Sequence, residues 1–155
     1  MAVTFLSTLK DAPSTAWDVS DNKDRSVLAW MVGSHLYVAA NGNIAPNPDA
    51  SGMFKNFTNL RSIDFGDCFD TSKVTSMASM FSGCSSLTSL DLSCFKTPHV
   101  DSMDRTFFGC SSLVYLDLSH FYAPKASVSM MFSGCNNLTN LTYSDSRILE
   151  VCRNR

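Results

Sequence analysis

Large apolar residues recur at fixed intervals over residues 53–143. The pattern Leu-x-x-Leu-x-Leu begins at Leu87 and again at Leu113, and its second half alternates apolar with polar residues. Such alternation is typical of a β-strand with one buried face. A related pattern, with substitutions, begins at Leu60 and at Leu138. The sequence therefore predicts four short strands at regular spacing.

Each predicted strand is followed by an aromatic residue and a return segment with apolar residues three and four apart. In one copy these are Val74, Met77 and Phe81, and Gly83 follows soon after. This spacing is typical of one or two helical turns with a buried stripe, and glycine often ends such a helix in a left-handed conformation. We therefore expect helical return segments, except in the last copy, where Pro124 interrupts the pattern. The equivalent glycines are Gly109 and Gly134.

The copies follow one another with a nearly constant period. Cys84, Cys110 and Cys135 occupy equivalent positions, 26 and then 25 residues apart. A period of this length is typical of leucine-rich repeats, whose stacked copies bury a common core that one copy cannot form alone. We predict an α+β leucine-rich-repeat solenoid with four repeats and one parallel β-strand per repeat over residues 53–143.

Residues 1–52 do not share the repeat. Two apolar runs, residues 26–32 and 35–40, flank a Gly-Ser pair, which is typical of a β-hairpin. We expect this hairpin to act as an N-terminal cap over the apolar end of the first repeat, with Trp17 and Trp30 packed there.

The C-terminal segment, residues 144–155, is expected to form a short amphipathic cap or tail. It ends in the basic cluster 153–155, which is expected to be a frayed end and not a binding patch.

Two stretches of the repeat carry a specific motif. Residues 80–93 read Met-Phe-Ser-Gly-Cys-Ser-Ser-Leu-Thr-Ser-Leu-Asp-Leu-Ser, and residues 69–77 read Phe-Asp-Thr-Ser-Lys-Val-Thr-Ser-Met. Together with the lead-in at residues 16–20 and 36–38, they resemble the bacterial BspA-like leucine-rich-repeat surface proteins. The resemblance covers nearly the whole chain after Ala16. It implies a solenoid with a binding role, often adhesion to host or matrix proteins, on secreted and anchored proteins.

The composition is that of a folded protein, with 45% hydrophobic and 17% charged residues. The formal net charge of -2 argues against nucleic-acid binding, which usually needs a basic excess. No run approaches the roughly 18 apolar residues of a membrane span, so we expect no membrane insertion. The start lacks the features of a secretory signal. Two localisations stay open. The resemblance favours a protein that is secreted or at the cell surface, whereas a full-length chain without a signal would favour the cytoplasm.

Five of the six cysteines fall into two columns of equivalent positions. Neighbours in a column of stacked repeats lie about 4.8 Å apart, which is close enough for a disulfide. Buried reduced thiols that act as small apolar side chains are the favoured interpretation. The columns are Cys84, Cys110 and Cys135, and Cys68 and Cys94.

The sequence offers no strong metal site. No pair of Cys-x-x-Cys spacings occurs, as a zinc site would need. His120 follows Cys68 and Cys94 in their column, so a Cys–His pair is an alternative to a simple substitution within the repeat. The acidic loop at residues 18–24 lacks the register of a calcium loop. We expect neither metal nor cofactor.

Asp64, Asp91 and Asp117 form a column of carboxylates on the outward face of the predicted sheet. Stacked like charges raise carboxylate pKa values, so a paired-acid hydrolase site is one alternative. A solvated ladder carried by the repeat is the simpler interpretation. No nucleophile elbow and no phosphate-binding glycine loop occurs, and we expect no catalytic residue.

The favoured function is binding of another protein, because stacked repeats present the same outward positions side by side. Tyr115 is the expected anchor, and Asp91 and Asp117 favour a basic partner surface. The protein is then a bacterial surface or adhesion protein, or an intracellular inhibitor carried by a phage or mobile element; a spacer domain is a third possibility. The expected binding residues are Ser62, Asp64, Ser89, Asp91, Ser93, Tyr115, Asp117, Ser119, Asn140 and Thr142.

Overall fold

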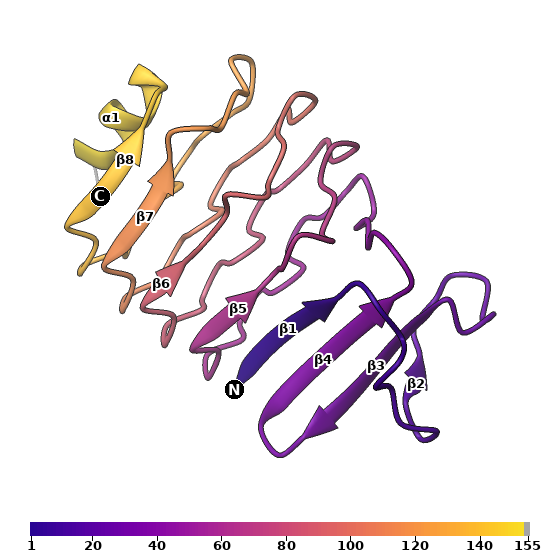
Figure 1. The fold of residues 1–155 in the computed structure, drawn as a ribbon. Coiled ribbons are helices and arrows are strands. Elements are labelled where there is room, and N and C mark those ends of the chain that lie inside the picture. Colours follow the sequence, from indigo (N-terminus) through magenta and orange to yellow (C-terminus); the bar gives the residue numbers. More distant parts are fainter. Residues whose placement is uncertain (154–155) are drawn as a thin grey trace.

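The computed structural model describes residues 1–153; residues 154 and 155, which belong to the expected basic tail, lie outside the described residues. The regular secondary structure of the described chain is mostly β-strand, arranged in two sheets. None of its helices is long and apolar enough to cross a membrane. The elements are β1 (Ala2–Leu6), β2 (Trp17–Asp18), β3 (Val27–Val32), β4 (His35–Ala40), β5 (Ser62–Asp64), β6 (Ser89–Leu90), β7 (Tyr115–Leu118), β8 (Asn140–Tyr143) and α1 (Ser146–Arg153) (Figure 1).

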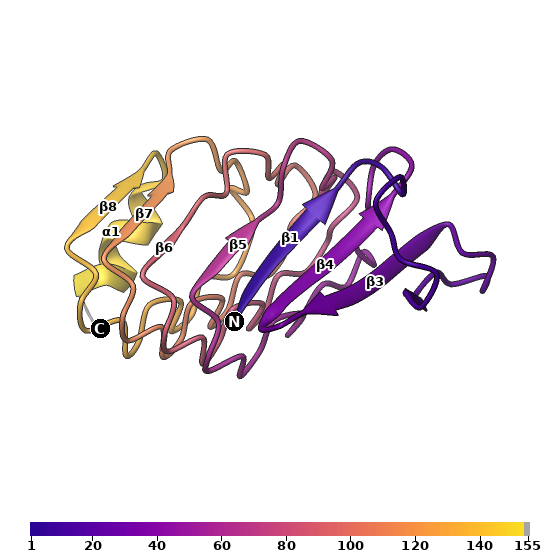
Figure 2. The ribbon, with the colours of Figure 1, turned by 60° about the horizontal axis from the view of Figure 1, so that its bottom comes forward.

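From about residue 49 the chain winds in successive turns that lie side by side (Figures 1 and 2). The strands of the last three turns pair in parallel, with Ser89 opposite Tyr115 and Tyr115 opposite Asn140. On the return side, parallel bridges join Asp49, Ser76, Ser102 and Ser127 in order. Equivalent residues of neighbouring turns therefore lie next to one another.

A column of phenylalanines fills the centre of these turns. The ring centroids of Phe54 and Phe81 are 5.4 Å apart, those of Phe81 and Phe107 5.7 Å, and those of Phe107 and Phe132 5.6 Å. The ring planes differ by 6° or less, and all four side chains are buried. Each stacked pair adds about 0.5–1.5 kcal/mol beyond the burial of its area. The column therefore stabilises turns that keep the same length and register.

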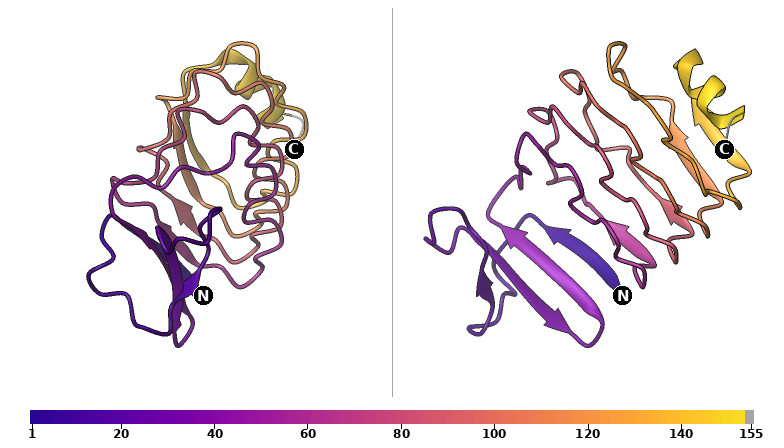
Figure 3. Two further views of the ribbon diagram at one scale, coloured as in Figure 1. Left: turned by 90° about the vertical axis from the view of Figure 1, so that its right-hand side faces the viewer. Right: turned by 180° about the vertical axis from the view of Figure 1, so that it is seen from behind.

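The return segments are not helical, so the prediction of helical turns there is wrong. The amide of Met77 donates to the carbonyl of Ser102 at 2.9 Å, and the amide of Phe81 donates to the carbonyl of Thr106 at 2.9 Å. A helix would direct these N–H groups to carbonyls four residues earlier in the same segment. Here they donate to carbonyls of the next turn, so a ladder of backbone hydrogen bonds joins each return segment to the following one. The return segments lie side by side in Figure 3.

Two columns of left-handed residues produce this zigzag. The glycines predicted to be left-handed have φ of 76° at Gly83, 69° at Gly109 and 81° at Gly134, so that prediction is confirmed although they end no helix. Four residues earlier, a second left-handed column holds non-glycine residues in three of the turns. Its members are Gly52, Ser79, Arg105 and Met130.

The N-terminal part contributes more than the predicted hairpin. β3 and β4 form that hairpin, with Val32 opposite His35. β1, which the sequence analysis did not predict, lies between β4 and β5 and pairs in parallel with both. The hairpin therefore adjoins β1 and not β5.

The two tryptophans do not pack on the end of the first repeat. Trp30 is buried in a small separate cluster with Ala16, Leu28 and Ala39. Trp17 lies on the short edge strand β2 and is 57% exposed, so its prediction as a packing residue is wrong. The edge position explains this, since no neighbouring strand covers that side.

The expected C-terminal cap is α1. Ile148 is 3% exposed and belongs to the main core, and Val151 packs against the same core. The Arg147 guanidinium donates to the carbonyls of Ala126 at 2.8 Å and Ala123 at 2.6 Å, and it pairs with Asp145. These bonds join the helix to the preceding return segment.

The cysteines of the longer column are buried, and each thiol donates to a carbonyl of the preceding turn. The acceptors lie 3.1 Å from Cys84, 3.1 Å from Cys110 and 2.9 Å from Cys135. Burial raises the pKa of Cys84 from 9.0 to about 11, and burial also raises the pKa of Cys110. The Cys84 and Cys110 thiols thus stay protonated at neutral pH, and each thiol of the column adds one hydrogen bond between turns.

Gly134→Ala is expected to lower the free energy of unfolding by more than 1 kcal/mol. A left-handed alanine costs about 1–2 kcal/mol, and its Cβ would lie 3.2 Å from Cα of Gly109. Met130→Gly, at an exposed left-handed position with φ of 52°, should leave stability unchanged or slightly higher. Urea unfolding of both variants measures the difference; equal stability of Gly134→Ala and wild type would contradict the backbone described here.

Stability is expected to fall as the pH rises from about 9 to about 11. In this range the unfolded chain releases the Cys84 proton while the folded chain keeps it, and the unfolded state is favoured by this difference in pKa. Urea unfolding of wild type and of Cys84→Ala measures the free energy of unfolding at each pH across this range. The difference between the two proteins isolates the contribution of Cys84, because the other titrating groups contribute equally to both. Parallel pH profiles for the two proteins would show that the thiol is not protected by folding.

Candidate functional site

The ten predicted binding residues all lie on the outward side of β5 to β8 and of the bends that follow these strands, which we call the sheet face. Nine are exposed and Asp117 is half-buried. The alternation within each strand explains this, because buried residues such as Leu90 and Leu116 separate the outward ones. The prediction of which side chains point outward is therefore confirmed.

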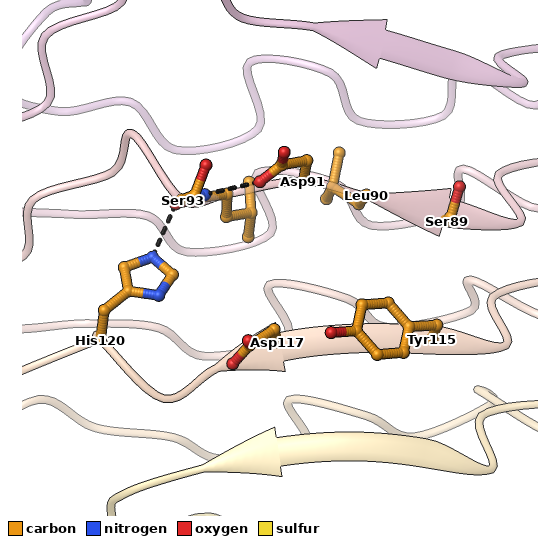
Figure 4. Close-up of a pocket in the computed structure, with 8 residues that line it drawn as sticks. Ser89, Leu90, Asp91, Ser93, Tyr115, Asp117 and His120 are labelled. Carbon is orange, nitrogen blue, oxygen red and sulfur yellow. Dashed lines mark hydrogen bonds between the residues drawn. The ribbon is translucent and has the colours of Figure 1, made fainter.

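Five of the ten converge on one hollow between β6 and β7, the front hollow, with a volume of about 340 Å³ (Figure 4). The ladder between the two strands ends at Leu90 and Leu116, and the hollow extends beyond that point. Its lining residues are Ser89, Leu90, Asp91, Leu92, Ser93, Tyr115, Asp117 and His120.

The aspartates of the column are held by the backbone two residues further on. Asp91 accepts from the amide of Ser93 at 2.9 Å, Asp117 from Ser119 at 2.8 Å and Asp64 from Gly66 at 2.9 Å. Each bond closes a turn that ends the strand. The carboxylates are thus fixed in place at the same point of successive turns.

The same hydrogen bonds influence the charge of Asp91 and Asp117. The amide of Ser93 lowers the pKa of Asp91, and the amide of Ser119 lowers the pKa of Asp117. The repulsion between Asp91 and Asp117 is a smaller opposing effect. Stacking does raise the pKa of Asp91, as expected, but the hydrogen bonds outweigh it, and the raised pKa on which the hydrolase alternative depends is found at neither Asp91 nor Asp117. Both groups are ionised at neutral pH.

Tyr115 and His120 complete the front hollow. Tyr115 is 47% exposed and lies two residues before Asp117 on the same side of β7, as Figure 4 shows. His120 crosses from the bend after β7 to the preceding turn, where Nε2 lies 2.7 Å from the carbonyl oxygen of Leu92. The hollow thus combines two negative charges with an exposed aromatic ring and an imidazole.

A second, smaller hollow of about 250 Å³ lies between β5 and β6. Asp91 and Ser93 line it as well, together with Asp64 and Cys94. Asp91 therefore takes part in both hollows. Four predicted residues share the sheet face without lining either hollow: Ser62, Ser119, Asn140 and Thr142.

The sequence analysis missed two parts of this face. His120 was considered only as a substitute in the cysteine column, although its place three residues after Asp117 was a signal. The other part is the extension over β1 and β4, where Thr4 lies opposite both Asp64 and Tyr37. The alternation in Ala2–Leu6, with Val3 and Phe5 buried, was the available sign of that strand.

The extension ends in a cluster of rings. His35 and Tyr37 stack with ring centroids 4.4 Å apart, and Trp30 and Tyr37 stack with ring centroids 5.4 Å apart. His35 Nε2 lies 2.8 Å from the hydroxyl oxygen of Thr4. The acidic column is therefore bordered by an aromatic cluster on its N-terminal side.

The described residues contain no group of three or more His, Cys, Asp or Glu side chains that could hold a metal ion. In the Cys68, Cys94 and His120 column, burial raises the pKa of the Cys68 and Cys94 thiols, which opposes the thiolate form that binds metals. The chemistry that the front hollow can supply is recognition of cations and of hydrogen-bond donors.

Three comparisons with known proteins bear on this chain. Among solved structures, a leucine rich cell surface protein from Faecalibacterium prausnitzii A2-165 matches with 22% identity and a TM-score of 0.43. The match covers 87% of this chain and 41% of that protein, so the chain spans less than half of its length. Among curated proteins, none matches.

The family comparison covers the turns and both hollows. A model described as "Mycoplasma protein of unknown function, DUF285" matches residues 48–147. This range begins next to Asp49, where the ladder between turns begins, and ends at Arg147 in α1. Because the match covers more than half of the chain, the protein belongs to the DUF285 family.

Proposed function

We propose that the protein is a leucine-rich-repeat solenoid that binds a partner protein through its sheet face and performs no catalysis. The observation that carries the proposal is the front hollow, where Tyr115, Asp91 and Asp117 come together from neighbouring turns. The in-register phenylalanine column and the ladder between turns support the solenoid interpretation, because identical units stacked in this way build one continuous face.

The chemistry of the hollow favours a lysine or arginine side chain of the partner. Two ionised carboxylates attract the cation, and the exposed ring of Tyr115 provides a flat apolar surface beside them. Tyrosine is also frequent among the residues that contribute most to binding energy at interfaces. The partner is therefore a protein that presents a basic side chain on a protruding segment.

The motif at residues 69–77 and 80–93 supports a role at the bacterial cell surface, as in the BspA-like proteins that it resembles. In that role the partner is a host or matrix protein. The buried thiols of Cys84 and Cys110, whose pKa values are raised by burial, favour the second candidate, an intracellular inhibitor, because reducing compartments preserve thiols.

Tyr115→Ala combined with Asp91→Asn is expected to weaken partner binding about 30-fold or more, since anchor residues at interfaces contribute about 2 kcal/mol or more. Binding of wild type is measured after capture from two pools, host surface and matrix proteins and bacterial cytosol. Each captured protein is then titrated against both chains at low and high salt. Binding of wild type should also weaken with salt, because charge pairs carry part of it.

The matched control is Tyr122→Ala combined with Asp101→Asn, which changes an exposed tyrosine and an exposed aspartate outside the front hollow. It should bind like wild type. If both double variants bind every captured protein as tightly as wild type does, the sheet face is not the binding surface. Capture from the host pool supports the surface protein, and capture of a cytosolic enzyme supports the inhibitor.

A further inference from the structure

The side of the molecule opposite the sheet face holds a hollow of its own. It lies on the return segments, has a volume of about 370 Å³ and reaches from the first turn to the fourth; we call it the back hollow. Lys55 lines it in the first turn, Arg105 and Phe108 in the third and Met130 in the fourth. The return segments that carry it lie side by side in Figure 3.

The floor of the back hollow is backbone. Gly83 and Gly109 line it, and a Cβ placed on Gly109 would lie 3.8 Å from Cα of Gly83, so the two glycines lie against each other. Arg105 and Met130, both in the left-handed column, stand beside this floor. The hollow is therefore open to a chain that lies across the turns.

Its charge is positive. Lys55 and Arg105 are exposed, and no carboxylate is among the residues that line the hollow. In the described part of the chain the ion pair is that of Arg147 with Asp145, far from here in sequence, so neither cation is neutralised by a salt bridge. Asp104, next to Arg105, accepts instead from the hydroxyl of Ser127 at 2.5 Å and from the amide of Ser129 at 2.7 Å.

The back hollow also has apolar lining residues. Phe108 is 36% and Met130 44% exposed, although both are large apolar side chains. The guanidinium of Arg105 lies 3.6 Å from the sulfur of Met130, so the cation rests along the apolar wall. Positive charge and apolar surface thus meet within one hollow.

From this charge complementarity we propose that the back hollow is a second docking site, for an extended acidic segment of a partner protein in which Asp or Glu alternates with a large apolar residue. The carboxylate pairs with the guanidinium of Arg105, which can bind it through two parallel hydrogen bonds, and Lys55 adds a second positive charge. The apolar residue covers Phe108 and Met130. The site is independent of the sheet face, whose negative charge repels the same segment.

The test uses the whole chain and a fluorescently labelled peptide of alternating Glu and Leu, with a Gln and Leu peptide as its neutral counterpart. Fluorescence anisotropy should show binding of the Glu peptide that weakens about tenfold in Arg105→Gln and in Lys55→Gln. Phe108→Ser should weaken both peptides. All three side chains are exposed, so the variants keep the fold, and thermal unfolding checks this.

Two matched controls separate the back hollow from other surfaces. Lys125→Gln removes an exposed cation outside the hollow, and Asp91→Asn changes the sheet face; both should bind the Glu peptide like wild type or, for Asp91→Asn, slightly better. The proposal would be overturned if the Glu and Gln peptides bound with equal affinity. It would also be overturned if Asp91→Asn lost binding of the Glu peptide while Arg105→Gln kept it. Tighter binding of a single-stranded RNA through Arg105 and Lys55 would overturn the assignment of a protein partner.

Discussion

The rest of the structure depends on the stacking of identical side chains on one another at the spacing of the turns. Phe81 and Phe107 are nearly parallel and 5.7 Å apart, and this geometry requires that both turns place the ring at the same height and in the same direction. The ladder of amide and thiol hydrogen bonds between turns imposes the same register. In stacked repeats each unit is stabilised mainly by its neighbours, so one turn of a different length would disturb two contacts at once.

The register also creates the two surfaces. On the strand side it aligns Asp91 with Asp117 and opens the front hollow where the ladder between β6 and β7 ends. On the return side it aligns glycines and leaves a bare floor between Lys55 and Arg105. The front hollow therefore carries two carboxylates and the back hollow two cations, although the chain as a whole is close to neutral.

The sequence predicted the strands and the outward residues because their pattern has a period of two and recurs in every copy. It did not predict the return segments correctly, since spacing of three and four also fits a zigzag whose N–H groups bond another turn. The acceptor of Phe81, the carbonyl of Thr106, is 25 residues away and invisible to local patterns. β1 was missed for a similar reason: its partners β4 and β5 are distant and it repeats nothing. His120 was missed because it differs from the equivalent Cys68 and Cys94, so the repeat pattern gave no indication that this position lines the front hollow.

Hydrogen exchange of the return-segment amides tests the stacking most directly. The amides of Phe81 and Phe107 donate to the next turn, whereas the equivalent amide of Phe132, in the last turn, has no such acceptor among residues 1–153. We predict slow exchange at Phe81 and Phe107 and distinctly faster exchange at Phe132. Equal exchange at the three positions, or uniform protection along each return segment as in a helix, would contradict the ladder between turns and the two surfaces built on it.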